Sequence, residues 1–88
     1  MKLKQGLSLR SVGGQQVLAS LDPAPGDFGG MILLNATGAC LCRLLEQGAE
    51  REALVQALTD RFEVSEADAA QSVDRFLQRL EEAGLLEP

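Results

Sequence analysis

The stretch Met31–Gly48 joins an apolar run to a helical pattern, and this junction constrains the fold more than any other part of the chain. Met31–Leu34 is a continuous apolar run of strand length. Asn35 follows it with a side-chain oxygen that can accept hydrogen bonds from the first N–H groups of a helix. Residues at helical spacing then follow at Thr37, Leu41, Leu44 and Leu45. Gly48 supplies a helix end, so the sequence predicts a strand joined to a helix with almost no loop.

Two more strands are predicted before this junction. Leu7–Val12 and Gln16–Leu21 each show a period-2 pattern, and Gly13 and Gly14 between them suit a tight hairpin turn. In the second segment one face carries Val17, Ala19 and Leu21. These segments are therefore expected to form an antiparallel hairpin.

The segment Asp22–Gly30 is rich in proline and glycine, which excludes a helix or a central strand. We expect an exposed loop here, with Phe28 folded back as an anchor in the core.

Two further helices are predicted in the second half of the chain. The stretch Glu50–Phe62 carries an apolar stripe at Leu54, Ala57, Leu58 and Phe62. Ser65, with Asp68 three residues later, resembles a capping box at the start of the last helix. That helix has the strongest stripe, at Ala69, Val73, Phe76, Leu77, Leu80 and Ala83, and it ends at Gly84. The order β-β-β-α-α-α predicts an α+β domain spanning 1–88, a three-stranded antiparallel meander followed by three helices that cover one side of it.

Composition excludes several function classes. The net charge of −5 repels phosphate backbones, so no nucleic acid is expected as a partner. Apolar runs are too short to cross a membrane and the N-terminus has no signal-like segment, so no membrane contact is expected and the cytoplasm is the predicted location. The absence of histidine, tyrosine and tryptophan removes the usual general bases, so we expect no enzyme and no cofactor.

The two cysteines lie two positions apart on a predicted helix and point in different directions. Cys40 and Cys42 therefore cannot pair with each other, and two cysteines without histidine are too few for a zinc site. We interpret both as small apolar core residues, with no metal bound.

Two runs of residues resemble the PqqD family. The first is Leu34-Asn35-Ala36-Thr37-Gly38 followed by Leu41, Leu44, Leu45 and Gly48, and the second is Phe76, Leu77, Leu80 and Gly84-Leu85-Leu86. The similarity extends from about Val17 to Leu86. Cys42 stands where the family often has an aromatic residue, so the chain resembles the superfamily more closely than the branch that makes pyrroloquinoline quinone (PQQ).

The resemblance implies a small winged-helix-like domain without catalytic residues of its own. Such domains recognise the leader segment of a ribosomally made, post-translationally modified precursor peptide (RiPP). They present it to a modifying enzyme, often a radical SAM protein, as PqqD does in PQQ biosynthesis. The implied partners are a leader peptide and a radical SAM or other peptide-modifying enzyme.

The meander itself favours the same mechanism. Its third strand lies at an edge, and the free backbone groups of that strand can accept an extended peptide as a fourth strand, with the last helix as the other wall of a groove. The candidate peptide-binding residues are Met31, Ile32, Leu33, Leu34, Ala70, Val73, Asp74 and Leu77. Ala70 and Asp74 are chosen as the flank of the helix that lines the groove, and the opposite flank, through Arg75 and Arg79, is the competing choice.

Two other functions compete with peptide presentation. A winged-helix DNA-binding regulator has similar secondary structure, but its recognition helix needs a basic face, and Ser65–Leu86 carries five acidic residues against two arginines. The third hypothesis is a homodimer in which a second copy covers the exposed strand edge.

Overall fold

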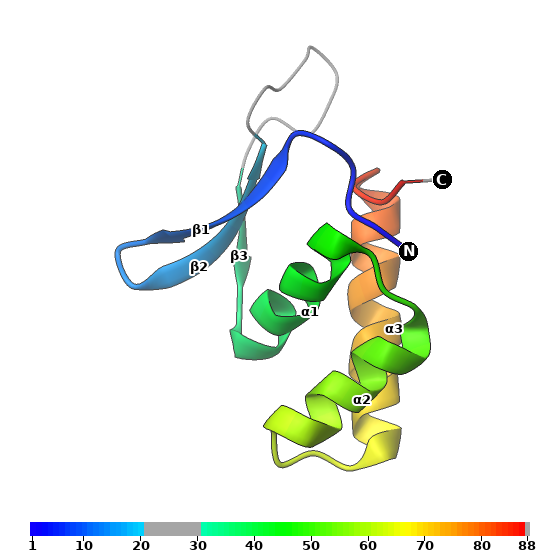
Figure 1. Ribbon diagram of the computed structural model, residues 1–88. Coiled ribbons are helices and arrows are strands. Elements are labelled where there is room, and N and C mark those ends of the chain that lie inside the picture. Colours follow the sequence, from blue (N-terminus) through cyan, green and yellow to red (C-terminus); the bar gives the residue numbers. More distant parts are fainter. Residues whose placement is uncertain (21–30, 88) are drawn as a thin grey trace.

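The computed structural model describes residues 1–20 and 31–87, and its elements follow the predicted order (Figure 1). The strands are β1 (Leu7–Val12), β2 (Gln15–Ser20) and β3 (Met31–Leu34), and the helices are α1 (Ala36–Gln47), α2 (Arg51–Arg61) and α3 (Glu66–Glu82). The expected loop, including Phe28, and the predicted strand end at Leu21 lie outside the described residues.

The three strands form the predicted antiparallel meander, in the order β1-β2-β3. Gly13 and Gly14 have φ angles of 59° and 82°, as a two-residue hairpin turn requires. This tight turn pairs Val12 with Gln15, so β2 begins one residue before the predicted position.

The face of the sheet that carries Leu18 of β2 packs on α1. Leu18 is fully buried and belongs to the same core cluster as the helices. Val17 and Ala19 are also buried, at 2% and 9% exposure, but they lie on the other face and do not belong to that cluster. Because apolar residues occupy both faces of β2, the period-2 pattern alone did not identify the face that meets the helices.

The helices extend the core away from the sheet. α1 packs against the sheet and α2, and α2 packs against α3 (Figure 1). Most of the largest fully buried side chains are leucines, at Leu18, Leu41, Leu45, Leu54, Leu58 and Leu80. In the described part of the chain no helix is both long and apolar enough to cross a membrane.

Each end of α3 is fixed by a short-range hydrogen-bond motif. Ser65 Oγ accepts a hydrogen bond from the Asp68 N–H at 3.1 Å, which confirms the predicted N-terminal cap. At the other end Gly84 adopts a φ of 72°. The Gly84 N–H donates to the Glu81 carbonyl and the Leu85 N–H donates to the Leu80 carbonyl, the two bonds of a Schellman motif.

The two ends of the chain are joined through the end of α1. Leu3, which is 4% exposed, forms an isolated antiparallel bridge with Leu86, and its N–H donates to the Leu45 carbonyl at 3.0 Å. The Lys4 N–H donates to the Leu85 carbonyl at 2.9 Å. The first residues therefore connect the last turn of α1 to the segment after α3.

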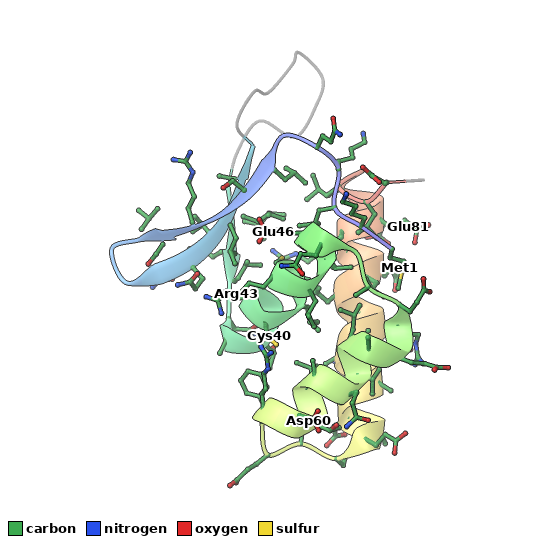
Figure 2. The ribbon with its side chains drawn as sticks, viewed as in Figure 1. Met1, Cys40, Arg43, Glu46, Asp60 and Glu81 are labelled. Carbon is green, nitrogen blue, oxygen red and sulfur yellow. The ribbon has the colours of Figure 1, made fainter. Side chains whose placement is uncertain are left out.

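Both cysteines are buried, as predicted. Cys40 Sγ accepts a hydrogen bond from Arg61 Nη1 of α2 at 3.5 Å, and Figure 2 shows Cys40 on the side of α1 that faces α2. Cys42 is fully buried, and desolvation raises the pKa of its thiol from 9.0 to about 12, with a smaller contribution from the nearby Glu46 carboxylate. Its thiolate is therefore strongly disfavoured at neutral pH.

Replacing Asn35 by Ala should destabilise the domain by about 1 kcal/mol, because the capping oxygen at the start of α1 is lost. Asn35→Asp keeps an acceptor at this position and is the matched control. Urea unfolding followed by circular dichroism measures both. Equal stability of Asn35→Ala and the wild type would show that the cap contributes nothing.

In a Cys40→Ala variant, Cys42 is the single thiol, and we expect iodoacetamide to modify it slowly in the folded protein at mildly alkaline pH. Concentrated urea should restore the rate of an ordinary thiol, because unfolding removes the desolvation. Mass spectrometry of the alkylated fraction over time gives both rates. Rapid alkylation of the folded variant would contradict the raised pKa.

Candidate peptide-binding groove

The edge of β3 that faces away from β2 has no partner strand within the described residues. Residues alternate along this strand: Leu34 is buried at 8% exposure, Ile32 is half-buried against the core, and Leu33 is 64% exposed on the other face. Met31 begins the strand. The free edge therefore presents backbone donors and acceptors next to an exposed apolar side chain.

A groove of about 430 Å³ adjoins this edge. The end of β3 and the first turns of α1 form one side, and α3 forms the other. Its lining residues are Leu33, Leu34, Asn35, Thr37, Gly38, Leu41, Ser72, Arg75, Phe76 and Arg79. In Figure 1 α1 lies between β3 and α3, and Thr37, Gly38 and Leu41 of its first turns are part of the lining.

The junction between β3 and α1 holds these first turns in place. Asn35 Oδ1 accepts hydrogen bonds from the Gly38 N–H at 2.8 Å and from Thr37 Oγ1 at 2.9 Å. Asn35 itself has extended backbone angles, so the strand geometry continues up to the first helical residue. The predicted strand-to-helix junction is therefore confirmed, and it fixes the free edge against the start of α1.

Gly38 lies where α1 closely approaches α3. A Cβ atom at this position would lie 3.1 Å from Asn35 Oδ1 and 3.3 Å from Cε1 of Phe76. The absence of a side chain lets the Phe76 ring pack over the first turn of α1, where it forms part of the groove lining.

The groove has an apolar floor and a basic rim. Phe76, Leu34 and Leu41 provide the apolar surface. Arg75 and Arg79 are exposed on α3, and no aspartate or glutamate is among the described lining residues. In a chain with a net charge of −5, the described lining of the groove thus carries only positive charge.

The structure brings only part of the predicted residue set to this groove. Leu33 and Leu34 line it, whereas Val73 is fully buried in the core and Leu77 is half-buried against the core. Ala70 instead lines a depression between α2 and α3. The flank of α3 chosen from sequence therefore does not border the groove.

Asp74 also faces α2, where it pairs with Arg51. Arg51 Nε and Nη2 donate to its two carboxylate oxygens at 2.6 and 3.0 Å, and this hydrogen bonding lowers the pKa of Asp74 below its ordinary value. The competing flank, through Arg75 and Arg79, borders the groove, together with Ser72 and Phe76. The sequence places Phe76 in the apolar stripe of the last helix and in the run that resembles the family, but not among the candidate peptide-binding residues. The short spacing between Phe76 and the two arginines is the signal that indicates a mixed apolar and basic flank.

The fold and the groove define a small α+β domain with an open sheet edge beside a helix. The chain belongs to the PqqD family: the family model for coenzyme PQQ synthesis protein D matches residues 10–86. A comparison with curated protein sequences gives no match.

Two solved structures share the fold over nearly the whole chain. The structure of TbiB1 in complex with the TbiA(beta) leader peptide has a TM-score of 0.78 and 26% identity, covering 99% of this chain and 95% of that one. The structure of lasso peptide synthetase B1 complexed with the leader peptide has a TM-score of 0.76 and 25% identity, covering 99% and 96%. Both neighbours are therefore leader-peptide complexes.

Enlarging residue 38 should reveal the close approach of α1 to Phe76. We expect Gly38→Ala to change the stability by less than about 1 kcal/mol, because better helix propensity offsets a contact that the ring can relieve by turning into the open groove. Gly38→Val should cost about 1–3 kcal/mol through overpacking.

Ala36→Val is the matched control, since Ala36 is exposed in the same turn of α1. Urea unfolding gives the stabilities, and the ring resonances of Phe76 should shift in both Gly38 variants. Equal costs for Gly38→Val and Ala36→Val would contradict the close approach.

Proposed function

We propose that this protein binds the leader segment of a ribosomally made precursor peptide by strand addition to β3. The single observation that carries the proposal is the edge of β3 that has no partner strand among the described residues and borders the groove. Its support is the PqqD family membership and the two structural neighbours, each described as a leader-peptide complex.

The geometry explains how one domain can hold a peptide without chemistry of its own. Backbone hydrogen bonds to β3 give affinity that depends little on the peptide sequence, while the groove contacts alternate side chains of the added strand. The groove is wide enough for side chains but lies open to solvent along its rim, so the peptide remains accessible to a second protein.

The bound peptide is then presented to a modifying enzyme in the cytoplasm. The domain acts as a non-catalytic peptide chaperone, and its partner is a radical SAM protein or another peptide-modifying enzyme. Biosynthesis of PQQ is one pathway of this kind, and other modified peptides are also made by an enzyme to which such a domain presents the leader. We expect peptide affinity in the range of about 0.1–10 μM, as for a small pre-organised groove.

The edge that accepts a peptide can also accept a second copy of the chain. In a homodimer, β3 of one copy would pair with β3 of the other and block the groove. Sedimentation across concentration separates the two cases, because dimerisation through β3 would weaken as peptide is added.

Filling the groove should weaken peptide binding while the fold survives. Ser72 is exposed and lines the groove, so Ser72→Tyr should weaken binding more than about ten-fold by steric exclusion. Gln71→Tyr is the matched control, because Gln71 is exposed on the same helix outside the groove lining. The probe is the tightest peptide selected by the wild-type protein from a displayed library of random 12-residue sequences.

Fluorescence anisotropy of the labelled peptide gives the affinities, and a ¹⁵N titration locates the site. Shifts concentrated in β3 and α3 support the proposal. A library that yields no binder, or a peptide whose shifts avoid β3, would overturn it.

A further inference from the structure

The groove differs in charge from the rest of the molecule. The chain carries thirteen acidic and eight basic residues, yet the groove lining contains two arginines and no described acidic residue. The acidic residues labelled in Figure 2 lie elsewhere, since Glu46, Asp60 and Glu81 are near the C-terminal ends of α1, α2 and α3. A groove with the opposite sign to the protein attracts a ligand of negative charge.

The side chains of the two groove arginines have no ion-pair or hydrogen-bond partner among the described residues. Arg51 is paired with Asp74, and Arg61 donates to Cys40. In contrast, Arg75 and Arg79 are exposed and form no ion pair or side-chain hydrogen bond with any described residue. Their guanidinium groups are thus free to bind carboxylates from a ligand.

The spacing of these arginines matches an extended peptide. Arg75 and Arg79 are four residues apart on α3, which separates them by about 6 Å along the helix axis. Alternate residues of a strand point to the same face and are about 6.6–6.8 Å apart. Leu34 of β3 is buried on the side of the helices, so every second side chain of a strand added beside β3 would face α3. Two side chains that are two positions apart can therefore meet the two arginines.

The floor adds an apolar requirement. Phe76 lies against the first turn of α1, and with Leu34 and Leu41 it forms the apolar part of the lining. An inward-facing apolar residue next to the acidic pair would pack here, two positions further along the strand.

We propose that the groove selects leader segments whose inward-facing positions carry two carboxylates separated by one residue, followed or preceded at the same spacing by an apolar side chain. This inference rests on the proposed function, and it names Arg75 and Arg79 as the residues that determine specificity. The occupant is an extended acidic peptide, recognised by charge on the rim and by apolar contact on the floor.

The test uses peptides selected by the full-length protein from a displayed library of random 12-residue sequences. We expect enrichment of aspartate or glutamate at two positions separated by one residue. The double variant R75Q/R79Q should bind the best such peptide about three- to thirty-fold more weakly, the effect of losing two exposed ion pairs. Wild-type affinity should also fall as salt rises from low to high concentration, because exposed charges are screened.

The control R10Q/R43Q removes the same charge from exposed arginines of β1 and α1 outside the groove lining and should leave affinity unchanged. Charge reversal, R75E/R79E, should transfer preference to the same peptide with lysine at the two acidic positions. Thermal unfolding of each variant verifies folding.

The outcomes separate this inference from the function on which it rests. Peptides that bind the groove without acidic enrichment, or bind R75Q/R79Q as tightly as the wild type, would overturn the charge rule and leave strand addition intact. A library without any groove-binding peptide would overturn both. Equal losses in R75Q/R79Q and R10Q/R43Q would show that net charge, rather than these two residues, sets the affinity.

Discussion

The hydrogen bonds of Asn35 at the junction of β3 and α1 are the constraint on which the rest of the structure depends. The Asn35 side chain accepts from Gly38 N–H and Thr37 Oγ1, so the helix begins one residue after the capping residue that ends the strand. Without slack between the two elements, the free edge of β3 is held at a fixed distance from the first turn of α1. That turn lines the groove, and its glycine allows Phe76 of α3 to approach.

Three sides of α3 face the core, α2 and the groove, respectively. Val73 and Leu80 are fully buried in the core, Asp74 faces α2 and pairs with Arg51, and Arg75 and Arg79 border the groove. Consecutive residues thus have unrelated roles, because a step of one position rotates the side chain by about 100° around the helix axis. Asp74 and Arg75 are adjacent in sequence, yet Asp74 pairs with Arg51 of α2 whereas Arg75 lines the groove.

Much of the fold was predictable because the signals are local. A capping residue, an apolar period and a glycine after the last turn act within one or two helical turns, and Asn35, Ser65 and Gly84 all behave as the sequence predicts. The burial of both cysteines also followed from their number and the lack of histidine. The core face of β2 did not follow, because Val17, Leu18 and Ala19 are all buried and apolar.

The sequence by itself determined the order of elements, the caps at Asn35, Ser65 and Gly84, the strand at the open edge and the family. It did not determine which flank of α3 faces that edge, and Ala70 and Asp74 lie on the side of α2 instead. The physical reason is that each flank of the apolar stripe carries exposed charged residues, Asp74 on one and Arg75 and Arg79 on the other, so nothing local distinguishes them. In the folded protein α2 packs against one flank, where Arg51 pairs with Asp74. The other flank, with its two arginines, therefore borders the groove.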